Sequence, residues 1–229
     1  MNKSGQHPAL KVAGSMWSGY RVTLIWYWSI FVIVYVGINL LLRHLGEVDE
    51  SMWGGGIWEG SVYSPKIFLL VIGILVTPVS LASYVTFGIT RKHFAWGSAL
   101  LFVGLSFVCT VLTAVGYPIE QLLYQMAGGT GDLKQPPLLE GSMDYFILSV
   151  GYCLAGWLIG NGYYGKDWRV GTIICVAALV PIILMEIIAD AGTSFALWLE
   201  VLMLLVVAGL LLAANLFLLR KVRIRRKLV

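Results

Sequence analysis

The hydrophobic positions of this chain fall into six long apolar runs that are separated by polar segments. Each run has roughly the 20 residues that a helix needs to cross about 30 Å of hydrocarbon. Helices are the expected form because lipid offers no partner to backbone N–H and C=O groups. The runs cover residues of about 22–42, 67–87, 94–117, 145–162, 170–189 and 195–219. The pattern therefore predicts an all-α membrane protein, a single six-span domain over residues 1–229 without a nucleotide-binding domain.

The segment before the first run has the pattern of an amphipathic helix. Apolar residues recur there at intervals of three and four, and they are Ala9, Val12, Ala13, Met16, Trp17 and Tyr20. A helix with one apolar stripe and an opposite polar face lies in the plane of the membrane interface. We expect residues 8–20 to form such an interfacial helix, either as a simple anchor or as a lever against a cytoplasmic partner.

The composition agrees with a membrane protein. Hydrophobic residues make up 59% of the 229 residues and charged residues 12%, whereas a soluble domain carries about 25% charged residues. The first run is longer than the roughly 7–15 apolar residues of a secretory signal peptide, and no small-residue cleavage site follows it. We interpret it as a span.

The distribution of Lys and Arg predicts the orientation, because cytoplasmic loops carry an excess of these residues. With the N-terminus inside, 13 of the 16 Lys and Arg residues lie on the cytoplasmic side. The outer loops keep Arg43, Lys66 and Lys134. We expect a protein of the cytoplasmic membrane with both termini inside. Its basic residues flank spans, where they meet anionic lipid headgroups, so we expect no nucleic-acid partner.

Residues 160–167 read GNGYYGKD, one residue short of a phosphate-binding P-loop. The P-loop ends in Ser or Thr and lies between a strand and a helix, whereas this stretch ends in Asp167 and follows a span. A carboxylate there would repel phosphates. We expect Gly156 and Gly160 to serve close helix packing instead, and Lys166 and Arg169 to hold the following turn in the cytoplasm.

Three carboxylates, Glu186, Asp190 and Glu200, flank the outer ends of the fifth and sixth runs. An ionisable residue at membrane depth is a functional hypothesis by default. These three either reach the outer headgroups or line a transport path or proton site. The sequence shows no Lys or Arg at a matching depth to pair with them.

Other chemistry is poorly supported. The three cysteines lie inside spans, and the three histidines are scattered outside them, without the spacing of a metal site. No GxSxG or HExxH motif occurs. We expect no metal, no cofactor in this chain and no enzymatic activity of its own.

The short basic segment after the second run reads FGITRKHF. It either fixes the topology or forms a short helix along the membrane that docks on a partner. Because it combines this segment with six spans and an amphipathic N-terminal segment, the chain resembles the membrane subunits of ABC-2-type exporters of Gram-positive bacteria, including the type that exports phenol-soluble modulins. The matching residues are Gly88, Ile89, Thr90, Arg91, Lys92 and Phe94. A second similarity covers the end of the fourth run, at Gly156, Gly160, Tyr163, Tyr164, Lys166, Arg169 and Gly171, although an Arg-Phe-Gly turn would be usual where residues 166–169 stand.

The resemblance implies a permease that pairs with a second copy or paralogue and with a separate ABC ATP-binding subunit, which binds ATP and Mg²⁺. It implies export of a hydrophobic or amphipathic substrate such as a peptide, toxin, antimicrobial or lipid-like molecule. Coupling to the ATPase would involve Gly88, Thr90, Arg91, Lys92, His93 and Phe94, with Phe94 in a pocket of the partner. Further cytoplasmic contacts would involve Met16, Trp17, Lys166 and Arg169.

Two alternatives stay open. A proton-coupled secondary transporter would use Glu186, Asp190 or Glu200. A membrane scaffold or immunity component would have a partner but would transport nothing.

Overall fold

The computed structural model describes residues 7–45, 57–126, 138–191 and 197–221. Within these ranges the chain is helical and contains no strand. The helices are α1 (Pro8–Leu45), α2 (Ile57–Ser61), α3 (Tyr63–Thr86), α4 (Arg91–Met126), α5 (Leu138–Gly165), α6 (Trp168–Ala191) and α7 (Leu197–Lys221). Lys134 and the basic tail beyond Lys221 lie outside the described residues.

Within the described ranges, six helices are long and apolar enough to cross a membrane, which confirms the predicted fold class. The segments with this character are Pro8–Ile38, Trp58–Thr86, Arg91–Met126, Gly141–Gly165, Trp168–Asp190 and Trp198–Arg220. Several extend past the predicted runs, because helix continues through polar residues that hydropathy assigns to the loops.

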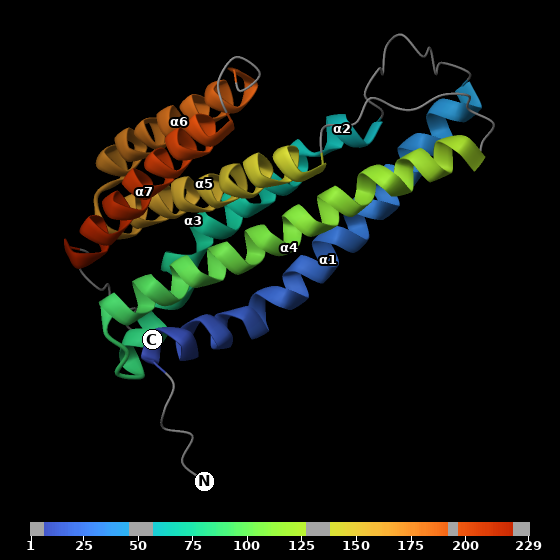
Figure 1. Ribbon diagram of the computed structural model, residues 1–229. Helices are drawn as coiled ribbons and strands as arrows, with labels where there is room; N and C mark the ends of the chain where they lie inside the picture. Colours follow the sequence, from blue (N-terminus) through green and yellow to red (C-terminus); the bar gives the residue numbers. More distant parts are fainter. Residues whose placement is uncertain (1–6, 46–56, 127–137, 192–196, 222–229) are drawn as a thin grey trace.

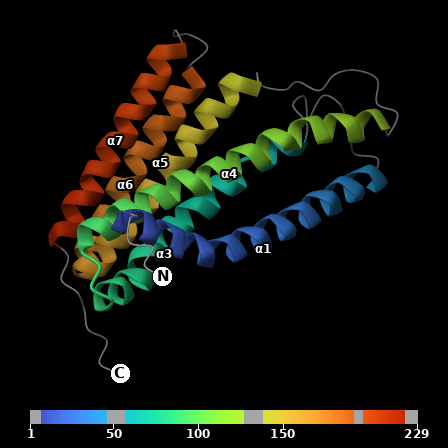
Figure 2. The same cartoon turned by 60° about the horizontal axis from the view of Figure 1, so that its bottom comes forward.

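The amphipathic segment 8–20 is helical, as predicted, and it is part of a longer helix rather than a separate element. It forms the first part of α1 and continues without interruption into the first span. Figure 2 shows this first part running at an angle to the rest of α1. The amphipathic pattern itself is confirmed, because Ala9, Val12 and Met16 are buried along one side.

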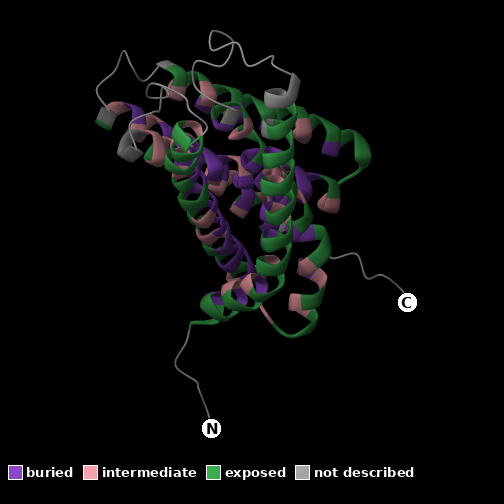
Figure 3. Cartoon of the chain, turned by 90° about the vertical axis from the view of Figure 1, so that its right-hand side faces the viewer, coloured by how far each residue is buried: buried purple, intermediate pink, exposed green. Residues whose placement is uncertain are grey.

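Helix α5 is the centre of the bundle. It packs against α3, α4, α6 and α7, while α1 packs mainly on α4 (Figure 1). A helix that is apolar on every side is buried on every side, and most of α5 between Tyr145 and Gly162 is buried. Figure 3 shows the resulting division between a buried interior and exposed outer helix faces, which are the faces that lipid would contact.

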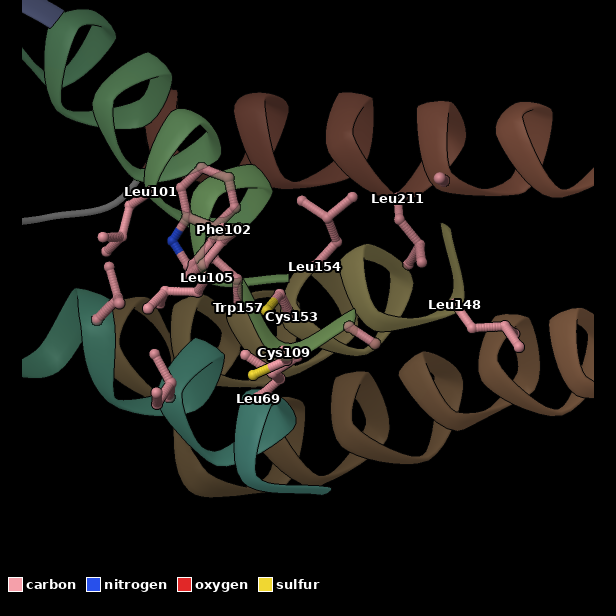
Figure 4. Close-up of a cluster of buried hydrophobic side chains, with 14 of the residues drawn as sticks. Leu69, Leu101, Phe102, Leu105, Cys109, Leu148, Cys153, Leu154, Trp157 and Leu211 are labelled. Atoms are coloured by element: carbon pink, nitrogen blue, oxygen red, sulfur yellow. The ribbon is translucent and has the colours of Figure 1, made fainter. Parts of the chain in front are cut away.

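The interior combines large apolar side chains with closely approaching backbones. Trp157 of α5 meets Phe102 of α4 edge to face, with the ring centroids 5.4 Å apart. Figure 4 shows this pair among side chains contributed by α3, α4, α5 and α7. Glycines bring α3 and α5 together, because a Cβ built on Gly156 or Gly160 would overlap backbone carbonyl oxygens of α3. This is the small-residue packing that membrane helices use.

Candidate functional site

The basic segment between α3 and α4 is a tight turn. Gly88 has φ of +80°, a left-handed conformation that glycine adopts without steric cost. The Gly88 N–H donates to the carbonyl of Val85, and the N–H of Ile89 donates to that of Tyr84, both at 3.0 Å. This is the Schellman pattern that ends a helix. The FGI part of the motif therefore terminates α3.

Thr90 begins the next helix. Its Oγ1 accepts a hydrogen bond from the backbone N–H of His93 at 3.3 Å and lies 2.9 Å from the His93 Nδ1. A threonine that accepts from the third residue after it is an N-cap. Residues 91–94 are then the first turn of α4. The expectation of a separate short helix along the membrane is wrong for this structure.

The residues of this turn that were expected to contact a partner differ in their solvent exposure. Phe94 is 0% exposed and its ring lies 5.9 Å from that of Tyr84, so the expectation that Phe94 fills a pocket on a partner is wrong. Arg91 and His93 are half-buried, and Lys92 is exposed. Among the turn's charged side chains, Lys92 is the most accessible to a partner.

The turn lies beside two other chain segments. The Arg91 Nη1 donates to the backbone carbonyl of Arg220 at the end of α7, at 3.4 Å. The ring of His93 lies 5.4 Å from that of His7, just before α1. The beginning of α1, the α3–α4 turn and the end of α7 therefore meet at one end of the bundle, here called the basic end.

The amphipathic part of α1 is packed onto α4 near the basic end. Val12 lies against Gly97, where an added Cβ would come within 2.6 Å of Val12 Cγ1, and Trp17 lies over Gly104. Met16 is buried, and the Ser98 hydroxyl donates to its Sδ at 3.9 Å. The expectation that Met16 contacts a partner is wrong, while Trp17 is half-buried.

The stretch that resembles a P-loop is helical up to Gly165, the last residue of α5. Lys166 and Arg169 are exposed at the turn into α6, and the Arg169 guanidinium lies 5.6 Å from the Trp168 ring. The stretch therefore lacks the strand–loop–helix form that cradles phosphate.

Asn161 of this stretch belongs to a buried polar network. The Trp157 Nε1 donates to Thr77 Oγ1 at 2.9 Å, and that hydroxyl donates to Asn161 Oδ1 at 2.7 Å. The Asn161 Nδ2 donates to Asn215 Oδ1 at 2.8 Å, and Asn215 donates to the carbonyls of Leu154 and Leu211. The network joins α3, α5 and α7 inside the bundle. Interhelical hydrogen bonds of this kind stabilise membrane helix packing.

A second buried cluster lies at the opposite end of the spans, centred on Lys66 of α3. Its Nζ forms an ion pair with Glu186 of α6, at 2.9 Å to Oε1 and 3.2 Å to Oε2. The hydroxyl of Tyr152 on α5 donates to the same Oε1 at 2.8 Å. Lys66 is only 5% exposed. The expectation that no Lys or Arg can pair with the carboxylates is therefore wrong for Glu186.

Aromatic rings complete this cluster, here called the Lys66 cage. The Nζ lies 4.6 Å from the ring centroid of Tyr63, 5.6 Å from Tyr145 and 5.8 Å from Tyr152. Sequence reasoning missed the cage because Lys66 directly precedes the second apolar run and was assigned to the outer loop. The tyrosines near the start of α3 and in the first half of α5, Tyr63 and Tyr145, were the available signal.

The remaining carboxylates differ in their surroundings. Asp190 is exposed near the end of α6, and Glu200 is buried in the first turn of α7. Glu120 of α4, which the sequence did not single out, is also buried, and its Oε1 accepts from the Tyr35 hydroxyl and the Trp58 N–H, both at 2.9 Å. Glu120 therefore holds α1, α2 and α4 together.

No group of three or more His, Cys, Asp or Glu side chains with the spacing of a metal site occurs within the described ranges. The geometry thus offers two candidate regions, the basic end and the Lys66 cage. Comparisons with protein families, with curated proteins and with solved structures found no match for this chain.

Proposed function

We propose that this protein is the membrane subunit of an ABC exporter of the cytoplasmic membrane, driven by a separate ATP-binding subunit. The basic end faces the cytoplasm, as the positive-inside rule requires. The cargo is a hydrophobic or amphipathic molecule that moves along the spans. Two copies, or this chain and a paralogue, form the complete membrane unit.

The observation that carries the proposal is the convergence of chain segments at the basic end. The start of α1, the α3–α4 turn and the end of α7 contact one another there through the contacts of Arg91 and His93. Exposed cations flank these segments at Lys11, Lys92 and Arg220. A partner that moves this surface would act on four spans at once, α1, α3, α4 and α7.

The mechanism follows from this coupling. ATP binding closes the partner's nucleotide sites, and the docked turn carries that movement into α3 and α4. The free energy of nucleotide binding then shifts the population between inward-facing and outward-facing states. The tight turn suits this role because the Schellman end of α3 and the N-cap of α4 fix the backbone that joins the two helices.

The proton-coupled alternative is less well supported. It relies on carboxylates that take up and release protons, and Glu186 is instead engaged by Lys66 and by Tyr152. Transport that persists without any ATPase and collapses with the proton gradient would favour this alternative. A partner that binds without nucleotide-linked change would favour a scaffold.

The test is co-purification with cassette ATPases from the same genome, followed by measurement of the ATPase rate in detergent. Lys92→Glu places an acid on the exposed part of the turn without touching the buried residues around it. We expect it to abolish the complex or its stimulation of ATP hydrolysis, while Lys92→Arg, which keeps the charge, retains both. A complex that is indifferent to Lys92→Glu would refute docking at this turn.

A further inference from the structure

The Lys66 cage has the composition of an ammonium-recognition site. Cations are attracted to aromatic faces within about 6 Å of the ring centroid, and three tyrosine rings meet that distance around the Lys66 Nζ. The Glu186 carboxylate supplies the countercharge at 2.9 Å. Aromatic rings with a carboxylate are the surroundings that proteins use to bind alkylammonium groups of ligands.

Part of the cage is held together by contacts that do not involve the Lys66 ammonium. Tyr145 and Tyr152 come from α5, and Glu186 comes from α6. Tyr152 holds the carboxylate through a hydrogen bond of 2.8 Å, and the Tyr145 hydroxyl donates to the carbonyl of Val62 at 3.1 Å. These contacts hold the Tyr145 and Tyr152 rings and one carboxylate oxygen through atoms other than the Lys66 ammonium, and preorganised groups bind at a lower entropic cost.

Negative charge exceeds what Lys66 neutralises in this region. Two further carboxylates lie close in the chain to cage residues, Glu59 four residues before Tyr63 and Asp190 four residues after Glu186 on α6. Glu59 and Asp190 are exposed, and the Glu186 side chain is 20% exposed. A cation that approaches from outside the bundle is therefore attracted to the cage.

The depth of the cage fits an amphipathic ligand. Glu186 lies 18 residues after Trp168, the first residue of α6, which corresponds to about 27 Å along the helix. The hydrocarbon layer is about 30 Å thick. The cage is thus at the boundary where the charged head of an amphipath lies while its apolar part stays in the hydrocarbon.

We propose that the Lys66 cage is a binding site for an alkylammonium group, with the Lys66 Nζ as its resting occupant. The ligand is an amphipath whose ammonium replaces the Nζ on Glu186 and on the tyrosine rings. The released lysine extends its flexible four-carbon stem toward the headgroup region. If the protein exports its ligand as proposed above, the cargo has a cationic head and an apolar body.

The experiment compares wild type with Lys66→Met in neutral detergent, using hexyltrimethylammonium as the probe. Lys66→Met empties the cage of its own ammonium, so we expect a lower thermal unfolding midpoint that the probe restores in a saturable manner. Hexyl sulfate and sodium chloride at equal concentration should not restore it. In wild type, binding should be roughly tenfold weaker or more, because the tethered lysine competes at a high effective concentration.

The matched control is the double variant Lys66→Met, Glu186→Gln, which keeps the three rings and removes both charges. It should show no saturable response to the probe. An equal response of the single and double variants would overturn the proposal, as would equal affinities of wild type and Lys66→Met.

A second measurement uses the wild-type protein and so does not depend on the folding of a variant. Buried Lys66 should react slowly with an acetylating reagent, and the probe should accelerate its modification severalfold, as read by mass spectrometry. Unchanged reactivity of Lys66 at saturating probe would overturn the displacement.

An experiment in nanodiscs distinguishes a lipid headgroup from a cargo molecule as the source of the ammonium group. Rescue of Lys66→Met by phosphatidylethanolamine relative to phosphatidylglycerol, without added probe, would support the site but overturn its assignment to a cargo. Rescue that requires the added probe in both lipids supports the cargo. None of these measurements uses an ATPase, so their failure is distinguishable from the failure of the exporter proposal.

Discussion

Replacing Gly156 with alanine is predicted to force α3 and α5 apart. A Cβ on Gly156 would overlap the carbonyl oxygen of Leu70, and it would lie 2.9 Å from the Leu70 carbonyl carbon and 3.2 Å from the backbone nitrogen of Ile74. These are backbone atoms, so no side-chain rotation relieves the overlap. One of the two helices has to move, and the contacts along their shared face loosen with it.

The size of the effect follows from two opposing contributions. Adding a methyl group to a tightly packed interior costs about 1–3 kcal/mol. The higher helix propensity of alanine offsets up to about 1 kcal/mol of this. We expect Gly156→Ala to lower the free energy of unfolding by about 1–2 kcal/mol.

Gly209 of α7 provides the matched control, because a Cβ there would meet nothing within 4 Å. Gly209→Ala gains the same propensity without the overlap, so it should leave stability unchanged or raise it by up to about 1 kcal/mol. The assay is titration of the detergent-solubilised protein with sodium dodecyl sulfate, followed by tryptophan fluorescence. Equal midpoints for the two variants would refute the inference that backbone contact at Gly156 limits the packing.

Three further substitutions, two of them with a control variant, test other features in the same titration. Asn215→Leu should lower the free energy of unfolding by about 1–2 kcal/mol, because it removes the acceptor of the Asn161 amide and two hydrogen bonds to backbone carbonyls. An unchanged midpoint would contradict this role. Gly88→Ala should cost about 1–2 kcal/mol, because its φ of +80° is unfavourable for a residue with a Cβ, and Gly88→Asn should cost less. Phe94→Ala should cost about 3–5 kcal/mol because its ring is fully buried, whereas exposed Lys92→Ala should change stability by less than about 0.5 kcal/mol; similar losses for both would argue against this burial.

The number of spans was predictable because run length alone decides it. Lipid requires a continuous apolar helix for each crossing, and each such helix is a single continuous stretch of the sequence. The stripe Ala9, Val12 and Met16 was equally visible, because helical periodicity places those residues on one side. Periodicity does not say what that side contacts, and here it contacts α4.

Two of the errors concern residues at helix ends. Phe94 looked like part of an exposed loop, but α4 begins at Arg91 and directs the ring toward the end of α3. Lys66 was assigned to the outside because hydropathy places the start of the span at Ile67. Its partner Glu186 is 120 residues away, and only the packing of α3, α5 and α6 brings the two together.

The uninterrupted length of α4 has a mechanical consequence. Its 36 residues extend about 54 Å, well beyond the roughly 30 Å of the hydrocarbon layer. Pro118 lies inside the helix, and a proline removes one backbone hydrogen bond and tends to kink a helix. The part before it, residues 91–117, is about 40 Å long, so a tilt of about 5° around one end would move its other end by about 3.5 Å. Thr90 caps one end of α4 at the turn. Near the other end, Glu120 accepts hydrogen bonds from residues of α1 and α2. A small tilt that starts at the basic end would thus produce a displacement of a few ångströms near the opposite side of the membrane.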